Sequence, residues 1–148
     1  MNSIVAVLFV TLVFVGALNA ADKPLMHCFT FTAVDSATAA DWEAFYKATD
    51  ALPGKVPTLA HVWYGKLVRP QGILTTDPET YKKLMTAKEG EKVSGPIERQ
   101  PRQYGVCMEF KSQDALKWYA DSPAHKEWEA VYFKVRVPGT TSFDLLQQ

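Results

Sequence analysis

The order of strand-like and helix-like patterns along the chain constrains its fold more than any other feature. Residues 26–34, MHCFTFTAV, alternate in character with period two, which predicts a β-strand. His27, Phe29 and Phe31 fall on one face of that strand, and Cys28 falls on the other. The two faces are therefore expected to meet different surroundings.

A helical pattern follows this strand. Asp35 or Ser36 is expected to cap a helix that runs to about Ala51, because a short polar side chain can satisfy the free amides of the first turn. The segment LPGKVP, residues 52–57, is expected to stop it, since glycine suits the C-terminal position and proline cannot continue a helix. A second strand is predicted at 59–68.

Residues 69–102 are mostly polar and contain several prolines. We interpret them as a long insertion on the domain, with a short helix at 78–88 capped by Asp77. A surface excursion and a lid over a site are both compatible with this composition, and the excursion is the preferred interpretation.

The second half of the chain repeats the pattern of the first. Alternation predicts a strand at 103–110, Ser112 is expected to cap a helix, Pro123 interrupts that helix, and a last strand is predicted at 140–146. The order β-α-β-(insertion)-β-α-β predicts an α+β, ferredoxin-like fold. Its four-stranded antiparallel sheet would have both helices on one side.

The other face of such a sheet needs cover. Cys28, Thr30, Thr32 and Cys107 are predicted to point there, and a second copy of the sheet would cover them. The sequence thus predicts a two-fold homodimer through the sheet face. One disulfide and two buried thiols are both open possibilities for the cysteines.

The N-terminal segment has the pattern of a targeting sequence. Residues 1–21 carry no charge, and the apolar run at 4–18 is shorter than the roughly 20 residues that span a bilayer. We interpret residues 1–20 as a secretory signal peptide, with an uncleaved anchor as the alternative. The mature domain, 21–148, is then secreted or periplasmic and has no stable membrane insertion.

Charge and spacing argue against several classes of partner. Sixteen basic residues balance sixteen acidic ones, so no excess positive charge is present to bind nucleic acid or an acidic membrane. The three histidines are dispersed and no Cys-x-x-Cys or glycine-rich phosphate loop occurs. We expect no metal and no organic cofactor.

Several short segments together resemble one family. MHCFTF, LPGKVP, YGK on the second strand, YADSPAH and the final FDL are similar to the stress-responsive dimeric α+β barrel (Dabb) domain. The resemblance covers most of residues 26–146, apart from the insertion at 69–102. It implies a homodimer formed through the sheets.

The resemblance also implies a candidate catalytic set. A distantly similar plant member, olivetolic acid cyclase, closes a linear polyketide by aldol chemistry without metal or organic cofactor. Its Tyr and His pair matches Tyr119 and His125, its first-strand His matches His27, and its last-strand Asp matches Asp144. Tyr104 replaces another histidine of the cyclase pocket.

The side chains of these four residues fit one chemical interpretation, proton transfer next to a carbonyl group. An imidazole can remove a proton next to a carbonyl, a phenol can donate to the resulting enolate, and a carboxylate can fix the imidazole tautomer. Apolar walls are predicted from Phe29, Phe31, Phe45, Tyr46, Tyr104, Val106 and Trp128.

Each catalytic candidate also has an ordinary structural interpretation. His125 can cap a helix, Tyr119 can belong to the core, His27 can be a half-buried strand residue, and Asp144 can be an edge-strand charge.

Three functions follow from these interpretations. The preferred one is a secreted dimer that binds a small apolar molecule, because polyketide intermediates are normally kept inside cells. The alternatives are a cofactor-free, polyketide-cyclase-like enzyme and, from related barrels, a monooxygenase or haem-handling protein with His125 or His27 as the contact.

Overall fold

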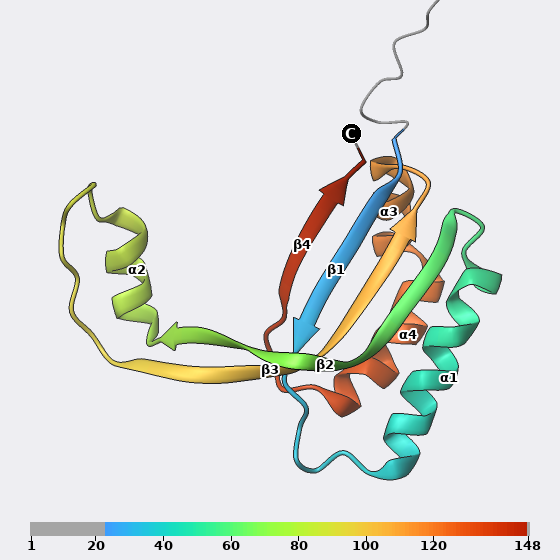
Figure 1. The fold of residues 1–148 in the computed structure, drawn as a ribbon, viewed down its shortest axis with the longest axis horizontal. Helices are drawn as coiled ribbons and strands as arrows, with labels where there is room; N and C mark the ends of the chain where they lie inside the picture. The colour runs from blue at the N-terminus through green and yellow to red at the C-terminus, as the bar shows by residue number, and fades with distance from the viewer. Residues whose placement is uncertain (1–22, 148) are drawn as a thin grey trace, which may run out of the picture.

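The computed structural model describes residues 23–147 and forms one antiparallel sheet covered by helices on one side (Figure 1). The strands are ordered β2-β3-β1-β4 and every neighbouring pair is antiparallel. The predicted α+β, ferredoxin-like fold is therefore confirmed. The elements in chain order are β1 (Leu25–Phe31), α1 (Ala39–Lys55), β2 (Leu59–Thr76), α2 (Pro78–Thr86), β3 (Ile97–Phe110), α3 (Gln113–Asp121), α4 (Pro123–Val135) and β4 (Thr141–Leu146).

The predicted signal peptide, residues 1–20, lies outside the described residues. Within residues 23–147, no helix combines the length and the apolar character needed to cross a membrane.

Helix α1 begins and ends later than its sequence pattern predicts. Thr38, and neither Asp35 nor Ser36, is the N-cap: its hydroxyl accepts from the Asp41 amide at 3.2 Å, while the Asp41 carboxylate accepts from the Thr38 amide at 3.0 Å. The helix also continues through Pro53 to Lys55. It does so because Leu52 is buried in the last turn, and packing there outweighs the one hydrogen bond that a proline removes.

Strands β2 and β3 are much longer than predicted. Beyond an irregularity between Lys66 and Gln71, they pair as a two-stranded ribbon that ends at Thr76 and Ile97. This ribbon leaves the sheet and carries α2 at its tip (Figure 1). We call residues 69–102 the arm. A two-stranded ribbon has no covered face, so burial imposed no apolar alternation by which these strands could be recognised.

The core lies between the sheet and α1, α3 and α4. Phe31, Phe45 and Phe110 are fully buried there, and each contributes about 1.5–3 kcal/mol by the transfer of its side chain out of water. Trp128 on α4 donates to the Thr49 hydroxyl at 2.9 Å, and that hydroxyl donates to the Phe45 carbonyl at 2.7 Å. These bonds satisfy the Trp128 ring N–H and the Thr49 hydroxyl, and they hold α4 against α1.

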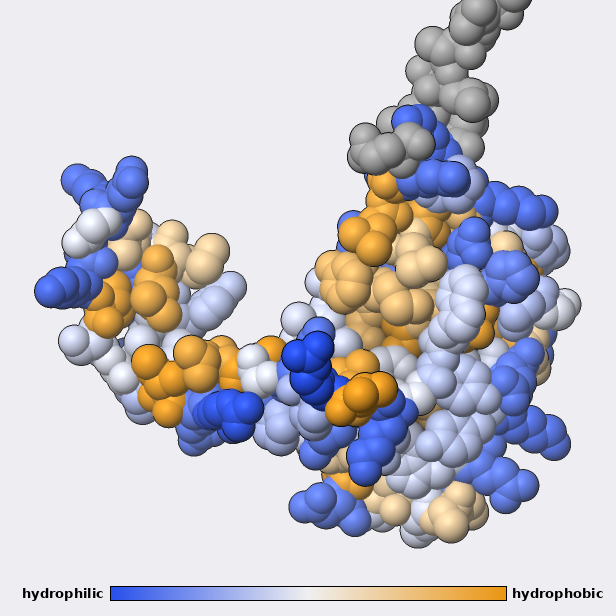
Figure 2. Space-filling model, in the orientation of Figure 1, coloured by the Kyte–Doolittle hydropathy of each residue, from blue (hydrophilic) through white to orange (hydrophobic). Residues whose placement is uncertain are grey.

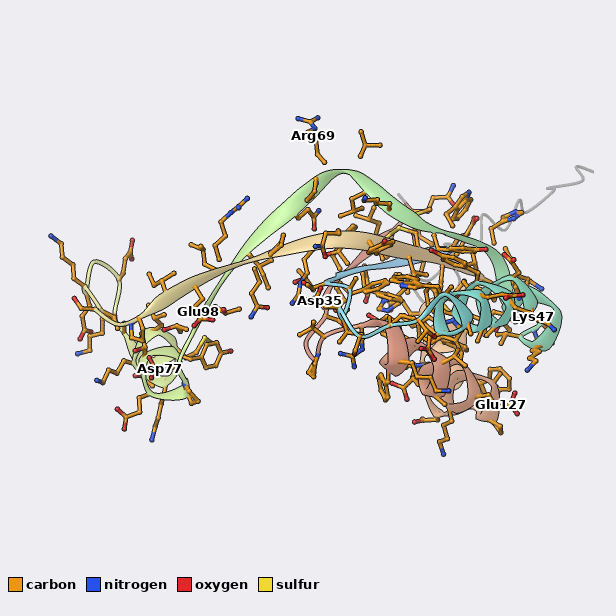
Figure 3. The ribbon with its side chains drawn as sticks, turned by 90° about the horizontal axis from the view of Figure 1, so that it is seen from below. Asp35, Lys47, Arg69, Asp77, Glu98 and Glu127 are labelled. Carbon is orange, nitrogen blue, oxygen red and sulfur yellow. A yellow bond between two sulfur atoms is a disulfide. The ribbon has the colours of Figure 1, made fainter. Side chains whose placement is uncertain are left out.

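None of the helices within residues 23–147 covers the opposite face of the sheet. In Figure 3 the helices of the body lie below the sheet, and Arg69, at the bend of β2, points out on the upper side. Apolar residues gather on this bare face over β1, β3 and β4 (Figure 2).

One row of side chains crosses the bare face. Phe143, Cys28, Cys107 and Trp63 are register partners on the four strands. Cys28 and Cys107 form a disulfide with a Cα–Cα distance of 4.1 Å, which settles the alternative that the sequence left open. Phe143 and Trp63, at the two ends of the row, are about half exposed.

Candidate functional site

A cavity of about 330 Å³ opens between the sheet and the junction of α3 with α4. Its volume is at the lower end of the range for small-molecule sites, about 300–1,000 Å³. Its walls are apolar except for two imidazoles and one phenol. The lining residues are His27, Phe29, Met108, Leu116, Tyr119, Ala120, His125 and Trp128.

The α3–α4 junction positions two of the polar side chains. Ser122 is both the last cap of α3 and the N-cap of α4: its hydroxyl donates to the Tyr119 carbonyl at 2.7 Å and accepts from the His125 amide at 3.2 Å. Pro123 occupies the first position of α4, where its missing N–H costs no helical bond. The interruption thus turns the chain so that Tyr119 and His125 meet, with ring centroids 4.9 Å apart.

Tyr119 lines the cavity and carries a buried donor without a partner. Its side chain is 3% exposed, and its hydroxyl is buried without a hydrogen-bond partner. Burial raises the pKa of this phenol well above its ordinary value, with a smaller contribution from the negative charge of Glu129. The group therefore remains protonated at physiological pH and can donate to an oxygen of a ligand.

His125 is held in one tautomer by the chain that precedes it. Its Nδ1 lies 2.9 Å from the Ala120 carbonyl oxygen. A carbonyl oxygen only accepts, so Nδ1 carries the proton and Nε2 has the free lone pair of the neutral ring. Glu129 lies 3.9 Å from Nε2, beyond hydrogen-bond distance.

His27 enters from the sheet and is oriented by Asp144. The Nδ1 atom is 2.7 Å from Oδ1 of Asp144, which is the register partner of His27 on β4. Since an ionised carboxylate only accepts, Nδ1 donates and Nε2 is again the free nitrogen. Asp144, predicted from sequence as the group that fixes an imidazole tautomer, contacts His27 and not His125.

The structure places only part of the predicted apolar wall at this cavity. Phe29 and Trp128 line it. Phe31, Phe45 and Val106 do not, because α1 and α4 pack directly onto that half of the sheet and bury them completely.

Tyr46 and Tyr104 pack around Trp42, in the part of the aromatic core that also contains Phe31 and Phe45. Trp42 is 4.6 Å from Tyr104 and 5.7 Å from Tyr46 between ring centroids. Neither tyrosine is among the residues that line this cavity.

Sequence reasoning missed three lining residues, Met108, Leu116 and Ala120. Met108 is the register partner of His27 on β3, a pairing that cannot be read from the sequence alone. Leu116 and Ala120 are four residues apart on α3, so they share its inward face with Tyr119, and this spacing was an available signal.

Metal-ligating side chains are not clustered in the described part of the chain. Across residues 23–147, no three of the His, Cys, Asp and Glu side chains lie close enough together to hold a metal ion.

Comparisons with known proteins identify the fold. No family model matches the sequence, and no curated protein matches it. A Dabb family protein with a ferredoxin-like fold from Mesorhizobium loti is 14% identical with a TM-score of 0.54, over 85% of this chain and 98% of its own. A dimeric ferredoxin-like protein of unknown function from Bacteroides fragilis is 17% identical with a TM-score of 0.54, over 84% and 96%.

An enzyme is also among the similar structures. The hydroxynitrile lyase of Passiflora edulis is 9% identical with a TM-score of 0.56, over 86% of this chain and 95% of its own. These likenesses define the chain as an α+β protein with a ferredoxin-like fold, which several dimeric proteins share. Identities this low show the fold alone, so the similarity to olivetolic acid cyclase stays a prediction.

Proposed function

We propose that this protein is a secreted homodimer that binds a small apolar molecule bearing a carbonyl group in the cavity between sheet and helices. The observation that carries the proposal is the Tyr119 hydroxyl, which is buried without a partner on a side chain that lines the apolar cavity. An unpaired buried donor costs about 1–3 kcal/mol, which a ligand oxygen would recover. Apolar walls favour the rest of such a molecule.

Calorimetric titration with two probes of similar shape tests this proposal. Acetophenone carries a carbonyl group and ethylbenzene does not. We expect acetophenone to bind more tightly, and Tyr119→Phe to weaken its binding about fivefold, the equivalent of ~1 kcal/mol for one hydrogen bond. Ethylbenzene should bind both proteins equally. Equal binding of the two probes to the unaltered protein would reject the carbonyl specificity.

The homodimer is proposed through the bare sheet face. Phe143 and Trp63 leave apolar surface exposed there on both sides of the disulfide, and several proteins with this fold are dimeric. Trp63→Glu places a charge in the face, so we expect it to give a monomer in light scattering after size exclusion. The matched control is Trp118→Glu, which alters a similarly exposed tryptophan on α3. A dimer that survives Trp63→Glu would contradict this interface.

Secretion is supported by the uncharged, apolar N-terminal segment alone. The mass of the protein purified from its own host tests it. A first residue near Ala21 is expected, and a mature protein that begins at Met1 would overturn the proposal.

A second candidate function is cofactor-free proton transfer on a carbonyl substrate, as in the cyclase alternative. It is favoured by the His27–Asp144 pair, which leaves Nε2 of His27 free at the cavity. That nitrogen would take a proton from the carbon next to the carbonyl, and the electron pair would move to the oxygen, where Tyr119 donates a hydrogen bond. A hydroxynitrile lyase shares this fold.

Exchange of the methyl protons of acetophenone in D₂O, followed by NMR, tests the proton transfer. We expect His27→Ala to slow the exchange by about 10²–10⁴-fold, the usual contribution of a general base. Tight binding without catalysed exchange would reject the enzyme and leave the binding function. The monooxygenase or haem-handling alternative stays a prediction, for which a Soret band on adding haem is the test.

A further inference from the structure

Two arginines lie at the root of the arm, at the far end of α4 from the candidate cavity. Arg102, on β3, is 3% exposed, and Arg136 is the C-cap of α4. Both flank the chain that follows β1: Arg102 donates to the Thr32 hydroxyl, and the backbone of Arg136 forms a bridge with Ala33. The Arg136 guanidinium also lies over the Tyr132 ring, 4.9 Å from its centroid.

Each arginine uses only one nitrogen of its guanidinium group, Nη1, in a hydrogen bond within the described chain. Nη1 of Arg102 donates to Thr32 Oγ1 at 3.1 Å, and Nη1 of Arg136 donates to the Val137 carbonyl at 3.3 Å. The Nε atoms of both are buried without a partner in the described chain. The Nε–Nη2 edge presents two parallel N–H groups, and such an edge matches two oxygens of a carboxylate or phosphate.

Among residues 23–147, no carboxylate pairs with either arginine. The ion pairs formed within residues 23–147 involve other residues, and none includes Arg102 or Arg136. Burial lowers the pKa of the Arg102 guanidinium, and the positive charge of Arg136 acts in the same direction. The C-terminus of α4 supplies about half a negative charge, which offsets only part of two full positive charges.

We propose that Arg102 and Arg136 form a binding site for a small oxyanion, the carboxylate or phosphate group of a small molecule. The unpaired edges provide the donors. Tyr132, whose ring lies under the Arg136 guanidinium, bonds through its hydroxyl to that of Thr140 at 3.1 Å. Arg136 follows His125 by eleven residues of α4, about 16 Å along a helix, so this site is separate from the cavity.

The surroundings allow an anion to reach the pair. The exposed chain at 138–140, which joins α4 to β4, borders the site, and a side chain at Gly139 would come within 3.7 Å of Arg102 Nη2. Gly139 has φ +93°, a conformation that favours glycine. The arginines are thus covered on this side by a short surface segment and not by the core.

Thermal unfolding of the full mature protein, in sodium chloride, phosphate or acetate at one ionic strength, tests the proposal. We expect phosphate or acetate to raise the melting temperature in a saturable way that chloride does not reproduce, and the stronger of the two to identify the preferred oxyanion. Arg136→Gln should weaken the apparent affinity at least tenfold. Arg136→Lys, which keeps the charge but loses the paired donors, should weaken it as well.

Arg69→Gln is the matched control, because Arg69 is an exposed arginine of the arm and should leave the response unchanged. Arg102→Gln is expected to behave as Arg136→Gln does; because Arg102 is buried, the Arg136 variants keep the test valid if that protein fails to fold. Identical melting curves in all three salts, or an undiminished response in Arg136→Gln, would overturn the site.

Discussion

His27 and Asp144 lie opposite each other on β1 and β4, and their side chains join at 2.7 Å between Nδ1 and Oδ1. The pair stands at the border between water and cavity: the His27 side chain is 25% exposed and that of Asp144 is 51% exposed. Because β1 is central and β4 is an edge strand, this bond also links His27 to the edge of the sheet.

Removal of the Asp144 charge should therefore act through His27. We expect Asp144→Asn to slow the proton exchange of acetophenone to a rate between those of the unaltered protein and His27→Ala, because the amide no longer fixes which nitrogen carries the proton. The binding constant for acetophenone should change little. Asp114→Asn, which alters an exposed carboxylate on α3, is the control. If Asp144→Asn were as fast as the unaltered protein, the pairing would be structural only.

Tyr119→Phe should raise stability while it weakens ligand binding. The substitution removes a buried hydroxyl that has no partner, so the free energy of unfolding should rise by about 1–3 kcal/mol. Tyr132→Phe is the matched control on an equally buried tyrosine, whose hydroxyl does bond to Thr140. That variant should lose about 1 kcal/mol in urea denaturation. A loss of stability in Tyr119→Phe would show that its hydroxyl is satisfied in solution.

The disulfide should matter mainly for stability. Cys28 and Cys107 are 79 residues apart, and closing a loop of this length restricts the unfolded chain. We expect the Cys28→Ser, Cys107→Ser double variant to lose about 2–4 kcal/mol in the free energy of unfolding. Reductant should lower the denaturation midpoint of the unaltered protein and leave that of the double variant unchanged. Equal midpoints with and without reductant for the unaltered protein would contradict the bond.

The Tyr64 phenol should ionise at a higher pH than an ordinary tyrosine, and the stability of the protein should fall over the same pH range. Its hydroxyl donates to Asp50 at 2.6 Å, and this bond, with burial and the negative charge of Asp50, raises the pKa of Tyr64 to about 12. A raised pKa in the folded state means that the bond stabilises the protein below about pH 10 and that this stabilisation is lost as pH rises from 10 to 12. Absorbance at 295 nm should show one tyrosine titrating near pH 12.

Two variants assign that titration. Tyr64→Phe should remove one tyrosine from the absorbance change near pH 12, while the buried Tyr119 still ionises late. Asp50→Ala should return the ionisation of Tyr64 toward pH 10, the ordinary value for a phenol. A Tyr64 ionisation that stays near pH 12 in Asp50→Ala would mean that Asp50 is not its cause.

The candidate site was only partly predictable, for a physical reason. Tyr119 and His125 were predicted from the family resemblance of YADSPAH. The helix break between them could be predicted from local sterics, because the residue before a proline is disfavoured in a helix. The hydrogen-bond partner of His27 could not be predicted from local patterns. Asp144 is 117 residues from His27, and only the β1–β4 register brings them together.

The sequence by itself determined the succession of strands and helices, because period-two and helical spacing record which side chains are buried. The sequence could not determine which part of the helix-covered side contains a cavity. Phe31 and Phe45 lie on the same side of the sheet as the cavity, but α1 and α4 pack over them and leave no space there. The cavity remains beside Tyr119. The tertiary structure also decided the disulfide, the length of the arm strands and the placement of Arg102 and Arg136 beside the chain that follows β1. Each depends on contacts between segments far apart in the chain, which local patterns do not encode.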